Sequence, residues 1–244
     1  MKTQDYIAIE NEYGAHNYHP LDVVVERAEG CFVYDVEGKK YLDCLAAYSA
    51  VNQGHCHPKI KEAFIEQVSK VTLTSRAFRN DKLPMLYKKM HELTGYDMFL
   101  PMNSGAEAVE TAIKLARRWG YDVKGVEKDK AEIIVASGNF HGRTTTIVGF
   151  SDDPDSYYGY GPYCKEAFPM HEYGNIEDLK SKITKNTVGV LIEPIQGEGG
   201  VVIPPEGYLK SVEQICRENN ILFICDEIQS GLGRAGKLFA HYYE

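Results

Sequence analysis

Two adjacent carboxylates end an apolar run in the last part of the sequence. Residues 221–227 read ILFICDE, so Asp226 and Glu227 follow a segment typical of a buried strand. A buried carboxylate is costly unless a cation or hydrogen-bond donors face it. A protonated aromatic nitrogen would stabilise Asp226, and the carboxylate would keep that nitrogen protonated, which makes the ring a better electron sink. The alternative is a structural aspartate that caps the next turn.

A second segment, MNSGAEAVETAIKLARRW, has the features of a helix that begins after a strand. Ser104 and Glu107 have the spacing of a capping box, which predicts a helix from Gly105. Gly105 and Ala106 leave the first-turn amides uncovered, and such amides together with the helix dipole suit a phosphate group. An ordinary capped helix is the alternative.

Two glycine-containing loops also follow apolar runs. In SGNFHGR, residues 137–143, Phe140 could stack on a planar ring and Arg143 could hold a substrate carboxylate. The alternative is a turn with a surface arginine. In EPIQGEGG, Glu193 stands at a strand end, and Glu198 lies on a glycine loop where it could hold an arginine until a substrate carboxylate replaces it. A solvated acidic loop is the alternative here.

Two other motifs point to different chemistry. GLGRAGKL, residues 231–238, is close to a phosphate-binding P-loop, and the acidic pair before it resembles the magnesium-organising strand of an ATPase. Leu238, however, replaces the hydroxyl residue, and the loop follows the acidic strand instead of preceding it. GHCHP, residues 54–58, has no further Cys/His cluster to complete a metal site, so we predict a helix entry at Pro58 and no metal site.

The elements that must position these residues alternate along the chain. Residues 21–46 predict short strands with turns at Glu29-Gly30 and Glu37-Gly38. Helices are predicted from Pro58 and over 81–94, 105–119 and 207–219, and strands over 96–103, 131–136, 188–195 and 221–227. Short apolar strands separated by helices predict an α/β fold with a mostly parallel sheet between helices. Ligands of such sheets bind at the carboxyl ends of the strands.

Composition narrows the function classes. The chain has 244 residues, 43% hydrophobic composition and a formal net charge of −8, without a basic face for nucleic acid. It lacks the roughly 20 continuous apolar residues of a membrane span, and its first residues do not read as a leader. We therefore expect a soluble cytoplasmic protein, and its six cysteines are expected to be reduced thiols.

The joint motif set resembles the class III, pyridoxal-phosphate-dependent aminotransferases of fold type I. The resemblance covers essentially the whole chain and is nearest to the members that act on ornithine. The stretches that carry it, in the family's order, are GAHNYHPLDVVVERAEG, AYSAVNQGHCHPKI, TLTSRAF, PMNSGAEAVETAIKLARRWGY, GNFHGRT, EPIQGEGGVVIPPEGYL and LFICDEIQSGLGRAGK. It implies that residues 1–56 are a β-rich segment of a small domain and that residues 57–244 belong to the large, cofactor-binding domain.

The resemblance also implies roles by position. The activity would be transfer of the δ-amino group of L-ornithine to 2-oxoglutarate, giving glutamate 5-semialdehyde and glutamate, with Asp226 and Gln229 as catalytic residues. The cofactor-binding set would be Gly105 and Ala106 at the phosphate, Phe140 on the ring face with His141 after it, Asp226 at the ring nitrogen and Gln229 at the phenolic oxygen. The substrate-binding set would be Tyr18 and Tyr48 at ornithine, Arg143 at the α-carboxylate, Glu193, and Glu198 as the gating carboxylate.

The sequence departs from the family pattern in three places. Ser104 stands where many relatives have threonine, and Gly199 where many have alanine. In the family the Schiff-base lysine follows the DEIQ strand and a further strand, and Lys237 does not match that position, so we expect residues 1–244 to be an amino-terminal portion. Rival interpretations are an acetylornithine or 4-aminobutyrate aminotransferase and a catalytically inactive binding chain. By resemblance we expect a homodimer with no nucleic-acid or membrane partner.

Overall fold

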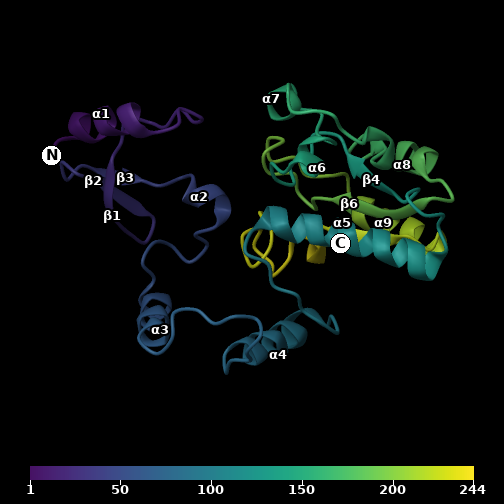
Figure 1. Cartoon of the computed structure of the whole chain (residues 1–244), viewed down its shortest axis with the longest axis horizontal. Helices are drawn as coiled ribbons and strands as arrows, with labels where there is room; N and C mark the ends of the chain where they lie inside the picture. The colour runs from purple at the N-terminus through teal and green to yellow at the C-terminus, as the bar shows by residue number, and fades with distance from the viewer. The chain divides into compact units, whose positions relative to one another are not determined.

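The computed structural model describes residues 1–244, which form two compact units, Met1–Phe99 and Leu100–Glu244 (Figure 1). The predicted division between residues 56 and 57 lies within the first unit and stays a prediction about the domains of the whole protein.

The first unit contains a small antiparallel sheet. Its strands are β1 (Val25–Glu29), β2 (Phe32–Asp35) and β3 (Lys40–Leu42), in the order β1-β2-β3. Gly30 and Gly38 adopt positive φ angles at the two predicted turns, which confirms those turns. The helix α1 (Thr3–Tyr13) could not be predicted from the sequence, because it buries no residue and so has no apolar stripe.

Three further helical segments complete the first unit. They are α2 (Ala46–Ser49), α3 (Pro58–Val68) and α4 (Leu83–Thr94). Pro58 opens α3 as predicted, and Gly95 ends α4 in the left-handed conformation. The four residues of α2 all have positive φ angles, between 48° and 71°, so this segment is a left-handed turn. Such a turn is strained for residues that carry a Cβ atom.

The second unit is built on a parallel sheet, as predicted. Its strands are β4 (Glu132–Ala136), β5 (Met170–His171), β6 (Thr187–Ile192) and β7 (Leu222–Cys225), and they pair in parallel in the order β5-β4-β6-β7. The predicted strand over 96–103 is wrong, because no strand of the chain pairs with these residues. Met98 in this segment is 92% exposed. An apolar pattern without a hydrogen-bonding partner does not make a strand.

Helices cover both faces of this sheet. α5 (Gly105–Trp119) packs against the face that carries Ile133 and Val135. α8 (Ile176–Lys182) and α9 (Tyr208–Glu218) pack against the face that carries Ile134 and Ala136. This alternation along β4 is the expected pattern of a strand buried on both faces. The remaining short helices are η1 (Gly120–Lys124), α6 (Thr145–Val148), α7 (Pro154–Tyr157), η2 (Lys165–Ala167) and η3 (Ala240–Tyr243).

The last residue of the chain caps a helix far from it in sequence. α9 begins after Gly207, which has no side chain to cap it. The carboxylate of Glu244 instead accepts hydrogen bonds from the backbone N–H groups of Gly207, Leu209 and Lys210, at 3.1, 2.8 and 3.2 Å. A carboxylate at a helix N-terminus is favoured by the helix dipole. Residues 240–244 are thereby anchored to α9.

None of the helices combines the length and apolarity that crossing a membrane requires.

Candidate active site

The predicted site residues of the second unit lie at the carboxyl edge of the parallel sheet. β4 leads into the SGNFHGR loop, β6 leads to Glu193, and β7 leads to Asp226. The backbone N–H of Asp226 donates to the carbonyl of Ile192 at 2.8 Å, so Asp226 still lies beside the end of β6. Parallel strands end at one edge, so three segments that are distant in sequence meet there.

Asp226 is a buried carboxylate whose two hydrogen bonds leave some of its acceptor positions unused. Its side chain is 6% exposed. Its Oδ2 lies 2.7 Å from Nδ1 of His141, and its Oδ1 accepts the backbone N–H of Ile228 at 3.0 Å. No lysine or arginine pairs with it. A carboxylate has about four acceptor positions, so each oxygen keeps capacity for one more donor. A protonated ring nitrogen is a donor of the kind that this carboxylate lacks.

His141 forms a hydrogen bond with the side chain of Asp226. Because an ionised carboxylate only accepts hydrogen bonds, the proton of this contact lies on Nδ1 of His141. The histidine side chain is fully buried, and its Nε2 has no partner in the chain. With the proton on Nδ1, the ring of His141 has no buried N–H group that lacks an acceptor. The structure therefore places His141 against Asp226, and its predicted contact with a cofactor stays a prediction.

The start of α5 offers free amides, as predicted. The backbone N–H of Glu107 donates to Oγ of Ser104, and the N–H of Ser104 donates to Oε2 of Glu107, both at 3.2 Å. This confirms the capping box. The N–H groups of Gly105 and Ala106 lie in the first turn of α5, where no carbonyl group of the helix can accept from them. No other group of the chain accepts from them. Two free amides at the positive end of a 15-residue helix can bind a phosphate group.

Close packing joins the start of α5 to the other two segments. A Cβ atom on Gly105 would lie 2.8 Å from Cγ2 of Ile228, in the turn that follows Asp226. Gly142 of the SGNFHGR loop has a φ of +124°, and a Cβ atom on it would lie 2.8 Å from the Cβ of Ala106. The free amides, the SGNFHGR loop and the Asp226 turn are therefore in contact with one another.

Two carboxylates hold the SGNFHGR loop. The N–H of Gly138 donates to both carboxylate oxygens of Asp152, at 3.0 and 2.9 Å. The N–H of Phe140 donates to Oε2 of Glu193 at 3.0 Å. The guanidinium of Arg143, which is exposed, lies 5.9 Å from the centre of the Phe140 ring. The role of Asp152 could not be predicted from the sequence, because no local pattern links this residue to a loop 14 positions earlier.

Glu193 is buried, with an exposed fraction of 6%. Besides Phe140, its carboxylate accepts the N–H of Gly197 at 3.3 Å, so Glu193 ties the SGNFHGR loop to the glycine loop of Glu198. Burial raises the pKa of Glu193, although the N–H group of Phe140, the nearby His141 and the N–H group of Gly197 oppose that rise. The predicted contact of Glu193 with a substrate stays a prediction.

The raised pKa of Glu193 predicts a specific pH dependence of stability. The contribution of a carboxyl group whose pKa is raised by folding is full below its unfolded pKa, near 4.5, and is lost as the pH rises through the folded pKa. We therefore expect the free energy of unfolding of the wild type, relative to Glu193→Gln, to fall as the pH rises above 4.5. Urea unfolding at a series of pH values measures this difference, with exposed Glu213→Gln as the control. A difference that grows as the pH rises would contradict the prediction.

Gln229 and Glu198 form a contact across the glycine loop. Nε2 of Gln229 donates to Oε1 of Glu198 at 2.9 Å. A Cβ atom on Gly197 would lie 1.2 Å from Oε1 of Gln229, so this glutamine occupies the space that a side chain at position 197 would need. The structure thus brings together two residues for which the sequence predicted separate roles, at the ring oxygen and at the gate.

Tyr18 and Tyr48, the two tyrosines predicted to contact ornithine, meet in the first unit. Their hydroxyl groups form a hydrogen bond with each other. Tyr48 lies in the left-handed turn α2, with a φ of 54°. Strained turns of this kind occur at functional sites, where the strain is offset by the surrounding structure. The role of the two tyrosines at a substrate stays a prediction.

The structure does not support a nucleotide-binding P-loop. Residues 231–238 form successive turns, and only the short η3 follows them, whereas a P-loop opens a helix. Nζ of Lys237 donates to the carbonyl of Tyr242 at 2.6 Å and lies 4.4 Å from the ring centre of Tyr243. This lysine is therefore directed to the C-terminal segment.

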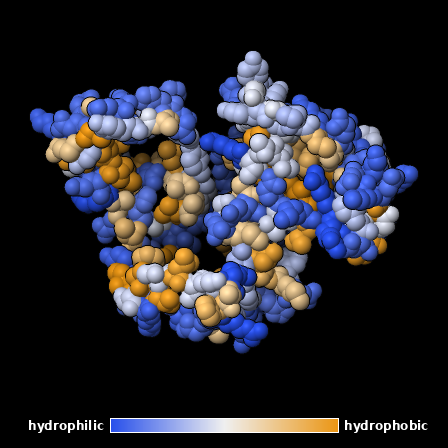
Figure 2. All heavy atoms as spheres, viewed as in Figure 1, coloured by the Kyte–Doolittle hydropathy of each residue, from blue (hydrophilic) through white to orange (hydrophobic).

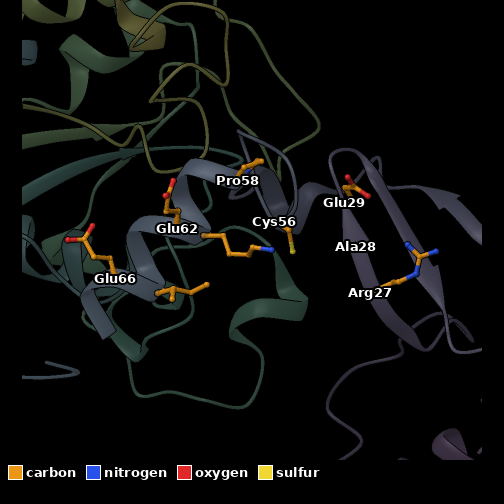
Figure 3. Close-up of a pocket in the computed structure, with 9 residues that line it drawn as sticks. Arg27, Ala28, Glu29, Cys56, Pro58, Glu62 and Glu66 are labelled. Atoms are coloured by element: carbon orange, nitrogen blue, oxygen red, sulfur yellow. The ribbon is translucent and has the colours of Figure 1, made fainter. Parts of the chain in front are cut away.

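The first unit contains a pocket of about 750 Å³ between β1 and the start of α3 (Figure 3). Arg27 and Lys61 line it together with Glu29, Glu62 and Glu66. Because this pocket is open and its lining carries charges of both signs, it does not favour one class of ligand. We therefore place the candidate site at the sheet edge of the second unit.

Comparison with known proteins identifies the family. The family model described as "Aminotransferase class-III" matches residues 13–244. The chain belongs to the class III aminotransferase family, as its motifs predict. Ornithine aminotransferase of Macrococcus caseolyticus is 61% identical over 239 residues, which are 98% of this chain and 60% of that protein.

Two solved structures show the same fold. An ornithine aminotransferase structure from Toxoplasma gondii, with partial occupancy of PLP at its active site, is 41% identical, has a TM-score of 0.97 and is matched over 99% of this chain and 57% of its own. Acetylornithine aminotransferase from Elizabethkingia anophelis is 49% identical, with a TM-score of 0.87, over 100% of this chain and 58% of its own. The chain spans about 60% of the length of the curated relatives it matches.

Proposed function

We propose that the protein is a pyridoxal-phosphate-dependent aminotransferase. It transfers the δ-amino group of L-ornithine to 2-oxoglutarate and yields glutamate 5-semialdehyde and glutamate. The observation that carries this proposal is the meeting, at one sheet edge, of two free helix amides, the loop that carries Phe140, and a buried aspartate with unused acceptor capacity. The 61% identity to an ornithine aminotransferase supports the choice of substrate.

The chain's own residues fit the cofactor. Pyridoxal phosphate, when bound, supplies an electron-withdrawing ring that stabilises negative charge on the substrate carbon. Gly105 and Ala106 bind the phosphate through their N–H groups, and Phe140 covers a ring face. Asp226 keeps the ring nitrogen protonated, and His141 keeps Asp226 in position through its Nδ1 proton. The lysine that completes the reaction is proposed to lie outside residues 1–244.

Further residues act on the substrates. Arg143 binds the α-carboxylate of glutamate or 2-oxoglutarate through paired N–H donors. Glu198 is the gating carboxylate, held by Gln229 in this structure. Tyr18 and Tyr48 contact ornithine, and their mutual hydrogen bond presents one polar surface to it.

The protein is also proposed to be a cytoplasmic homodimer. All six cysteines are free, and four of them are exposed, which suits a reducing compartment. Large apolar side chains are exposed on and after α3 (Figure 2), among them Phe64 at 68% and Leu73 at 88%. Apolar residues exposed in a group favour an interface between subunits.

An activity assay on the protein produced from its own gene tests the proposal. We expect turnover with ornithine and 2-oxoglutarate, followed as the product aldehyde, to exceed turnover with N-acetylornithine or 4-aminobutyrate. The similarity to an acetylornithine aminotransferase makes N-acetylornithine the second candidate. A preference for N-acetylornithine would replace the proposed substrate, and the absence of turnover with all three amines would contradict the proposed activity.

Replacing Tyr48 tests the substrate pocket. Tyr48→Phe removes the hydroxyl that contacts Tyr18 and leaves the ring. We expect the ratio of kcat/KM for ornithine to that for N-acetylornithine to fall roughly tenfold, because a polar contact to the charged amine is lost. Tyr13→Phe, at an exposed position of α1, is the matched control. An unchanged ratio in Tyr48→Phe would remove Tyr48 from the pocket.

A further inference from the structure

The second carboxylate of the acidic pair, Glu227, is mostly buried and accepts several hydrogen bonds. Its side chain is 10% exposed. It accepts four hydrogen bonds: from Oγ of Ser230 at 2.7 Å, from the N–H groups of Ala240 and His241 at 3.0 and 2.9 Å, and from Nδ1 of His241 at 2.8 Å. Hydrogen bonds to an ionised acceptor are stronger than neutral ones. Glu227 therefore joins the turn after β7 to residues 240–241.

The turn that Glu227 opens carries the contacts of the candidate site. The N–H of Gly231 donates to the carbonyl of Glu227 at 2.8 Å, which closes the turn. Within it, the N–H of Ile228 donates to Asp226, and Gln229 reaches Glu198. In Figure 1 these yellow turns lie beside the start of α5, in agreement with the contact between Gly105 and Ile228.

A role limited to docking the C-terminal segment does not account for this arrangement. Glu244 anchors the same segment to α9 through three backbone N–H groups. The segment therefore keeps an anchor when Glu227 is changed. The turn of residues 227–231, in contrast, is held by the backbone bond of Gly231 and by the Glu227 side chain through Ser230 and residues 240–241.

We propose that Glu227 is a positioning residue that aims Asp226 and Gln229 at the ligand. This inference rests on the proposed function, because the ligand is a phosphorylated pyridine. The buried carboxylate sets the turn, the turn donates the Ile228 N–H to Asp226, and the turn directs Gln229 across the glycine loop. The class of ligand affected is therefore a ring with a nitrogen at Asp226 and an oxygen at Gln229.

Glu227→Gln tests the inference, because it keeps the shape of the side chain and replaces one acceptor oxygen with a donor. We expect NMR-detected hydrogen exchange of the Ile228 and Gly231 amides in the unliganded chain to become about tenfold faster. The Kd of 4-deoxypyridoxine 5′-phosphate, an analogue with a methyl group in place of the reactive aldehyde, should rise about tenfold. Ser230→Ala removes one donor of the four and should change both quantities in the same direction by about threefold. Glu213→Gln, on the exposed face of α9, should change neither.

The two measurements separate the possible failures. Faster exchange confined to residues 240–244, or an unchanged Kd, would overturn the positioning role and leave Glu227 as a structural anchor. If the wild type does not bind the analogue, the proposed function fails, and the exchange of the Ile228 amide still decides whether Glu227 holds the turn. If Glu227→Gln does not fold, amide exchange and the Kd of the analogue in Ser230→Ala decide between a positioning role and a structural anchor.

Discussion

Asp226→Asn is expected to lower kcat by about a hundredfold or more. The amide has no charge to hold a ring nitrogen in its protonated form, so the ring loses its strength as an electron sink. The same change should raise the Kd of 4-deoxypyridoxine 5′-phosphate roughly 30-fold, because a buried charge pair loses one partner. Activity measures the first effect and fluorescence titration the second.

The design of the Asp226 experiment excludes a general charge effect. Asp155→Asn makes the same change at an exposed position of α7 and should leave both quantities unaltered. In the Asp226→Asn variant, the side-chain amide oxygen can still accept the Nδ1 proton of His141, whereas the hydrogen bond from the Ile228 N–H is lost, so urea unfolding must first show that the variant folds. A variant that folds and retains wild-type turnover and affinity would show that Asp226 has only a structural role, in which it accepts the Ile228 N–H in the turn after β7.

Gly142→Ala is expected to destabilise the second unit by about 2 kcal/mol or more. The added Cβ atom would lie 2.8 Å from the Cβ of Ala106, and the φ of +124° is unfavourable for alanine. The loop that carries Phe140 must then move away from the start of α5. We therefore also expect weaker binding of the pyridine analogue, in addition to a lower midpoint in urea unfolding.

Gly125→Ala is the matched control for the contact with α5. Gly125 has a φ of +78° and no atom within 4 Å of the position of an added Cβ, so alanine there meets only the backbone strain, about 1 kcal/mol. Equal losses of stability in the two variants would mean that the Gly142 contact does not hold the loop. Unchanged ligand affinity in Gly142→Ala would separate that contact from the site.

Local sequence signals predicted much of this fold. Ser104 and Glu107 mark the start of α5, and its buried residues Val109, Ile113 and Ala116 recur at helical spacing. The strand ends at Glu193 and Asp226 follow from apolar runs that stop at a carboxylate. The segment 96–103 failed because a strand depends on a partner, and no local pattern supplies that information.

Long-range contacts within the site could not be predicted from local patterns. His141 and Asp226 are 85 positions apart, and the sequence offers no reason for the histidine to face the aspartate. Glu227 finds its partners 13 and 14 positions later, in a segment without a strong pattern. The resemblance to a family implies roles for Asp226 and Gln229 that stay predictions, whereas the structure shows which neighbours hold the two side chains.

The protonation state of a bound ring tests the central claim most directly. 4-Deoxypyridoxine 5′-phosphate labelled with ¹⁵N in the ring reports that state through its ¹⁵N chemical shift. At a pH above the ring pKa of the free analogue, we predict the shift of a protonated nitrogen in the wild-type complex and of an unprotonated nitrogen in Asp226→Asn. A bound ring that titrates as it does in water would contradict the account.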